Sequence, residues 1–93
     1  MNQKLIKKKV RKWQRILFLH RWTLYGEIVK GNRARVSYDM EYFMAIIKVG
    51  KSIPKNLLDE TICHELLHLI MAENLKEEAL IEVLTKIIMK EWG

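Results

Sequence analysis

The chain has 93 residues, of which 49% are hydrophobic and 30% charged, and this predicts one folded domain, residues 1–93, with one modest core. No apolar run approaches the length that spans a bilayer, and the N-terminal lysines precede no apolar signal core. We therefore expect a cytoplasmic protein without a membrane partner. The single cysteine, Cys63, cannot form an internal disulfide, which fits a reducing compartment.

The net charge of +6 is unevenly distributed along the chain. Residues 1–35 hold 11 basic residues and one acid, Glu27, whereas residues 36–93 hold 6 basic and 10 acidic residues. The basic half is suited to contact nucleic acid or an acidic protein. An ordinary solvated helix face explains the same charge, and the sequence alone favours that simpler interpretation.

Residues 3–20 show the periodicity of an amphipathic helix. One stripe recurs at steps of 4, 3, 4 and 3 and comprises Ile6, Val10, Trp13, Leu17 and His20. We expect this stripe to cover a sheet, because it needs an apolar surface to pack against. His20, at its end, is then expected to be structural and not a metal ligand.

The next segment changes to the alternating pattern of β-strands. Residues 22–29 and 33–38 alternate on either side of the turn signal Lys30-Gly31-Asn32, which predicts a β-hairpin. Residues 42–49 are rich in aromatic and β-branched side chains and predict a third strand.

Two further helices are predicted after the strands. Pro54 suits the start of one helix, which we expect to run to residue 73, and Asn74 can end it and cap the next. Residues 75–91 carry an apolar face and form the last helix. The predicted fold class is thus α+β with the order helix, three strands, helix, helix. We expect the first helix on the sheet, the second packed beneath it, and the last crossing close to the second.

The second predicted helix contains the motif His64-Glu65-Leu66-Leu67-His68, which matches H-E-x-x-H. Residues four apart lie on one face of a helix, so His64 and His68 can share one zinc ion. Glu65 lies about 100° round from His64, where it can take a proton from a water molecule at the metal. Cys63 also faces about 100° away from His64, which favours a small buried residue over a ligand. An ordinary helix with two exposed histidines is the competing interpretation.

A catalytic zinc usually has three protein ligands, so the motif needs one more. The H-E-x-x-H-x-x-G-x-x-H arrangement fails here, because its glycine and last histidine positions are Met71 and Asn74. The last helix instead offers three glutamates, which are Glu77, Glu78 and Glu82.

The helical wheel ranks these glutamates. Glu77 shares the apolar direction of Ile81, Leu84 and Ile88 and stands first, because a carboxylate on a buried stripe needs a partner or a metal. Glu78 lies at the edge of the stripe and remains an alternative, and Glu82 is expected to be solvated. A capping box between Asn74 and Glu77 is the competing explanation for Glu77.

These residues carry a family resemblance. The last 40 residues resemble gluzincin-type zinc metallopeptidases, and the chain as a whole is similar to small metallopeptidases of phages and mobile elements and, more distantly, to the ImmA/IrrE-like group. The glutamate helix of those families has the form E-x-x-x-V-x-x-L, which Glu77, Ile81 and Leu84 resemble here. The resemblance implies zinc ligands at His64, His68 and Glu77, Glu65 as general base, and a minimal zincin-like fold.

The functional expectation is zinc-dependent hydrolysis of a peptide or protein substrate, with the peptide added as a strand at an exposed sheet edge. Two alternatives stay open. One is a degenerate zincin that binds zinc without cleaving peptides, and the other is a binding module whose basic helix contacts nucleic acid or an acidic protein. Substrate and oligomeric state cannot be predicted from these patterns.

Overall fold

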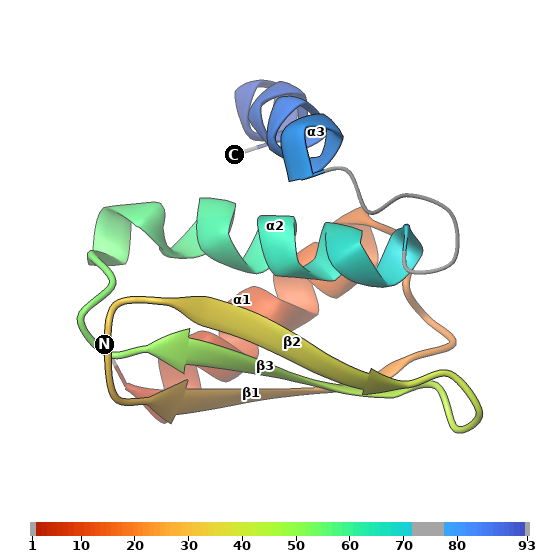
Figure 1. Ribbon diagram of the computed structural model, residues 1–93, viewed down its shortest axis with the longest axis horizontal. Coiled ribbons are helices and arrows are strands. Elements are labelled where there is room, and N and C mark those ends of the chain that lie inside the picture. The colour runs from red at the N-terminus through yellow and green to blue at the C-terminus, as the bar shows by residue number, and fades with distance from the viewer. Residues whose placement is uncertain (1, 72–77, 93) are drawn as a thin grey trace.

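A three-stranded mixed sheet carries two helices on one face, and a third helix lies beyond them (Figure 1). This arrangement is seen in a computed structural model, which describes residues 2–71 and 78–92. The elements in chain order are α1 (Gln3–Ile16), β1 (Thr23–Val29), β2 (Ala34–Asp39), β3 (Met44–Gly50), a 3-10 turn (Lys55–Leu57), α2 (Leu58–Ile70) and α3 (Glu78–Trp92). The predicted fold class and element order are confirmed, and none of these described helices is long and apolar enough to cross a membrane.

Helix α1 is shorter than predicted. The Asn2 side chain accepts a hydrogen bond from the Leu5 N–H and caps the helix start. The helix ends at Ile16, two residues before Phe18, whose positive φ of 56° cannot continue it. Ile6, Val10 and Trp13 are buried as predicted, but His20 is exposed in the following turn. The expectation that His20 ends the buried stripe is therefore wrong.

The predicted hairpin of residues 22–29 and 33–38 is also wrong. The strand order is β1-β3-β2, so β3 lies between the two strands that are neighbours in sequence. β3 runs parallel to β1 and antiparallel to β2. The link between β1 and β2 crosses the end of β3, where a side chain on Gly50 would meet the Gly31 carbonyl oxygen at 2.5 Å. Gly50 is therefore needed for a close backbone crossing.

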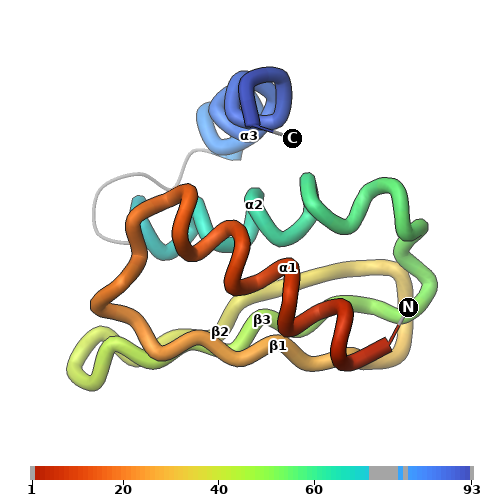
Figure 2. The backbone as a smooth tube through the Cα atoms, turned by 180° about the vertical axis from the view of Figure 1, so that it is seen from behind, coloured from red at the N-terminus to blue at the C-terminus, as the bar shows by residue number. Residues whose placement is uncertain are grey.

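Helices α1 and α2 share the inner face of the sheet, and the two opposite views agree on this (Figures 1 and 2). α1 packs on β1, whereas α2 packs on β2 and β3. The core between these layers is formed by side chains that alternate along β3 and face the helices, Ala45, Ile47 and Val49, together with Ile6, Trp13, Leu58, Ile62 and Leu66. α3 contacts α2 on the side away from the sheet, as expected, so the layers are the sheet, the pair α1 and α2, and α3. The expectation that the second helix packs beneath the sheet, opposite the first, is wrong, because both helices bury their apolar sides against the face that carries Ala45, Ile47 and Val49.

Gly26 sets the distance between α1 and the sheet. It is buried, and a Cβ added there would lie 2.4 Å from the Ile6 Cγ2 atom and 3.2 Å from the Val10 Cγ2 atom. We expect Gly26→Val to lower the free energy of unfolding by about 1–3 kcal/mol, because overpacking forces α1 outward. Urea unfolding measures this, and Thr23→Val on the exposed face of the same strand is the control. Equal stability of Gly26→Val and the parent would contradict this packing.

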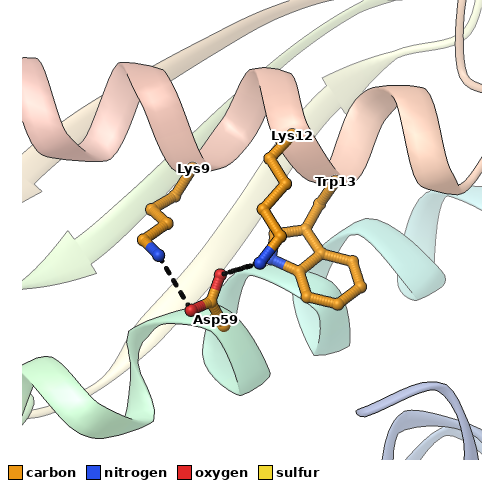
Figure 3. Close-up of polar contacts among 4 residues, drawn as sticks. All are labelled: Lys9, Lys12, Trp13 and Asp59. Atoms are coloured by element: carbon orange, nitrogen blue, oxygen red, sulfur yellow. Dashed lines mark hydrogen bonds and ion pairs between the residues drawn. The ribbon is translucent and has the colours of Figure 1, made fainter. Parts of the chain in front are cut away.

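Asp59, in the first turn of α2, ties that helix to α1 (Figure 3). The Trp13 indole N–H donates to its Oδ1 atom at 2.8 Å, and the Lys9 and Lys12 ammonium groups donate at 3.0 and 3.3 Å. Partial burial raises the pKa of Asp59, but the hydrogen bonds from Trp13, Lys9 and Lys12 outweigh it, so the pKa lies below its ordinary value. Asp59 thus stabilises the pairing of the two helices in its charged form.

The stability of this link should depend on pH with a defined sign. An acid whose pKa is lower in the folded state stabilises above its unfolded pKa and loses that contribution as pH falls through the folded value. We expect Asp59→Asn to cost about 1.5–3 kcal/mol at pH 7, typical of hydrogen bonds to a charged group. The difference from the parent should shrink below about pH 4. Chemical unfolding of both proteins between pH 3 and 7 checks this, and a constant difference would contradict it.

Candidate metal centre

His64 and His68 lie side by side on α2, one helical turn apart. Their ring centroids are 5.1 Å apart, and both side chains remain partly open to solvent. The helix that holds them is anchored by residues on its other faces, since Ile62, Cys63 and Leu66 are fully buried in the core. The expectation that Cys63 is a small buried residue is confirmed, and burial, followed by the nearby Glu60 and Asp59 charges, raises the pKa of its thiol to about 11.

Glu78, the first residue of α3, brings a carboxylate to both rings. Its Oε1 atom lies 2.5 Å from the His64 Nε2 atom, and its Oε2 atom lies 3.3 Å from the His68 Nε2 atom. One ligand atom from each of these three residues lies within 4.8 Å of the other two. Two imidazole nitrogens and one carboxylate oxygen form a donor set that suits zinc.

The other two candidate ligands of the last helix are Glu77 and Glu82. Glu77, ranked first from the sequence, lies outside the described residues, so the structure says nothing of its side chain. Glu82 is exposed, as expected for a solvated residue. Among residues 2–71 and 78–92, the histidine pair thus meets the alternative candidate, Glu78.

Glu65 lies between His64 and the backbone of Val36 in β2 and is only 9% exposed. Burial raises the pKa of its carboxyl to about 7, with His64 and the backbone amide of Val36 opposing the rise and Glu78 adding to it. Its Oε2 atom lies 4.0 Å from the His64 Nε2 atom. A carboxylate with a pKa near neutrality is suited to accept and return a proton.

A cleft of about 270 Å³ opens beside His64 and Glu65. Its walls come from the link before β2 and the start of β2, from the segment that leads into α2, and from α2 itself. They comprise Asn32, Ala34, Ile53, Pro54, Leu57 and Thr61. Candidate ligand, candidate base and cleft are therefore contiguous. Sequence reasoning missed the role of β2 here, because the contact of Val36 with Glu65 depends on how the sheet and α2 pack.

The searches for similar proteins gave no relatives. No protein-family model matches the chain, and no curated protein or solved structure matches it.

Proposed function

We propose that the protein is a zinc-dependent metallopeptidase of the gluzincin type. The observation that carries this proposal is the convergence of His64, His68 and Glu78 beside the buried carboxylate of Glu65. The same combination of two histidines and two glutamates occurs in metallopeptidases that use H-E-x-x-H with a glutamate from another helix. In this proposal His64, His68 and Glu78 hold the metal.

Zinc, when bound, supplies a Lewis acid that makes water nucleophilic near neutral pH and polarises a peptide carbonyl. Glu65 then has the task of a general base. Its carboxylate takes the proton of the attacking water and afterwards gives it to the leaving amine, which balances the hydrolysis. Burial keeps this carboxylate partly dehydrated and raises its pKa, which increases its affinity for the proton.

The open edge of β2 offers a place for the substrate backbone. β2 is an edge strand of the sheet, and within the described part of the chain no strand pairs with its outer edge. The Gly50 N–H donates to the Arg33 carbonyl, so the alternate residues Ala34, Val36 and Tyr38 turn their backbone groups to that edge, where the Val36 amide also bonds to Glu65. A peptide added there would pass the cleft beside His64 and Glu65.

The surroundings of this edge also favour one kind of substrate. Ala34 also borders a second hollow, of about 580 Å³, which is lined by four cations, Lys30, Arg33, Arg35 and Lys48. Arg35 and Lys48 are direct partners in the sheet, and like charges in that position repel each other. Alternate side chains of an added strand point to this face, so acidic residues near the cleaved bond would be attracted.

A peptide library tests the proposed function. The zinc-loaded protein should cleave a subset of peptides, with acidic residues enriched near the cut, as read by mass spectrometry. A chelator should abolish cleavage, and added zinc should restore it. Cleavage that continues in excess chelator would contradict the proposal. Zinc binding without cleavage of any peptide or protein would favour the degenerate zincin instead.

A further inference from the structure

The exposed side of α1 is a dense positive surface. We call it the basic face and define it by its exposed cations Lys4, Lys7, Lys8, Arg11 and Arg15. Four of these cations recur at helical steps of 4, 3 and 4 and span about 16 Å, namely Lys4, Lys8, Arg11 and Arg15. No acidic residue occurs before Glu27. An open hollow of about 1000 Å³ runs along this helix and is bordered by all five cations, with His20 at its end.

The cations of the basic face differ from the other lysines of α1. Lys9 and Lys12 are bound to Asp59, whereas no acidic group in the described chain forms an ion pair with the basic face. Like charges four residues apart on a helix repel by about 0.2–0.5 kcal/mol per pair. Lys4 with Lys8 and Arg11 with Arg15 are such pairs, and a row of phosphates would relieve their repulsion.

The packing of α1 indicates whether these phosphates belong to lipid headgroups or to a nucleic acid. An amphipathic helix binds a membrane by burying its apolar face in lipid. Here that face is fully used inside the protein, because Ile6 and Trp13 have no exposed surface and Val10 is 2% exposed. The apolar stripe of α1 is therefore not available for insertion into lipid, which favours a nucleic acid over a lipid surface.

Phe18 follows the basic face directly and indicates whether the nucleic acid is single-stranded or double-stranded. Its side chain is 82% exposed, its backbone holds the left-handed φ of 56°, and its N–H donates to the Arg15 carbonyl. Such a conformation is unfavourable for a bulky residue. The ring stands beside the His20 ring, with centroids 6.3 Å apart. His20 in turn borders the hollow along the basic face. An exposed aromatic ring at the end of a row of cations can stack on an unpaired base, whereas the bases of a duplex are already stacked.

We propose that the basic face and Phe18 bind single-stranded nucleic acid, with the phosphates along Lys4, Lys8, Arg11 and Arg15 and a base stacked on Phe18. This surface is separate from the candidate metal centre. α1 packs on β1, at one edge of the sheet (Figure 2). The cleft beside His64 and Glu65 borders β2, which forms the opposite edge. The proposal therefore does not depend on zinc or on peptide hydrolysis.

Fluorescence anisotropy with a labelled 20-nucleotide oligothymidylate and the corresponding 20-base-pair duplex tests this. A variant with Lys4, Lys8, Arg11 and Arg15 changed to Gln should bind the single strand at least about tenfold more weakly at 0.1 M salt. Its slope of log affinity against log salt should fall by roughly three, at about 0.7 for each cation removed. The matched control changes four exposed cations elsewhere to Gln, namely Lys51, Lys55, Lys86 and Lys90, and should resemble the parent.

Phe18→Ser separates stacking from charge. It should weaken binding of the single strand on the order of tenfold and leave the salt slope unchanged. Circular dichroism confirms that each variant is folded before binding is compared. The proposal is overturned by no binding of the parent, by duplex binding as tight as that of the single strand, or by an equal loss in the control variant. Binding to phosphatidylserine vesicles without binding to the oligonucleotide also overturns it.

Discussion

Glu65→Gln should still bind one zinc ion but lose peptide hydrolysis by on the order of a hundredfold or more. The substitution preserves the size and polarity of the side chain and removes only its capacity to accept the proton. The carboxylate does not belong to the group formed by His64, His68 and Glu78, so metal binding should persist. Thermal stability should not fall, because burial already disfavours the charged form of this side chain.

A matched control distinguishes catalysis from a general loss of acidic charge. Glu82→Gln makes the same chemical change at an exposed position of α3 and should retain full hydrolysis. His64→Ala should behave differently from both variants, because it removes a candidate ligand and should lower zinc binding and activity together. Hydrolysis by Glu65→Gln at the parental rate on a verified substrate would show that the proposed mechanism is wrong.

The second large effect is expected at Glu78. Glu78→Ala should lower zinc affinity by on the order of a hundredfold or more, since loss of an outer partner of a metal ligand alone costs 10–100-fold. Zinc at 100 times its dissociation constant should stabilise the parent by about 2.7 kcal/mol. At the same zinc concentration, a hundredfold weaker affinity should leave only about 0.4 kcal/mol of this stabilisation in Glu78→Ala. Titration calorimetry and thermal unfolding with and without zinc measure both quantities.

Glu77→Ala is the control that decides between the two neighbouring glutamates. Because Glu78 contacts both histidines, Glu77→Ala should keep the zinc affinity of the parent. A greater loss of zinc in Glu77→Ala than in Glu78→Ala would restore the residue that the sequence ranked first. The comparison should also include the zinc-free proteins, since Glu78 joins α3 to His64 without metal.

The histidine pair was predictable because it depends on one helix only. The spacing of His64 and His68 places both rings on one face wherever that helix packs, and the structure shows them together. The third candidate ligand depends on how two helices meet. The helical wheel ranked Glu77 by the buried direction, whereas Glu78 reaches the rings from the first residue of α3, with a side chain 59% exposed. A residue at a helix end need not lie on the apolar stripe to reach a neighbouring helix.

For the sheet as well, one property was predictable from the sequence and another was not. Alternation along residues 22–29 correctly separates the buried or partly buried Leu24, Gly26 and Ile28 from the exposed Thr23, Tyr25 and Glu27. It does not define which strands are partners, because a link of four residues can join adjacent strands or cross one strand between them. The residue in the sequence that is related to the crossing is Gly50, where backbone atoms of the link approach too closely for a side chain.

The role of Asp59 could not be predicted from the periodicity of apolar residues, because its partners lie about 50 residues away on α1.

Anomalous diffraction at the zinc edge, from crystals of the zinc-loaded protein, tests the metal centre most directly. We expect one anomalous peak between α2 and α3, with the His64 and His68 ring nitrogens and a Glu78 carboxylate oxygen each about 2.0–2.2 Å from it. Glu65 should lie beside the ion without binding it. A zinc peak at any other position, or coordination that excludes either histidine, would contradict the proposed metal centre.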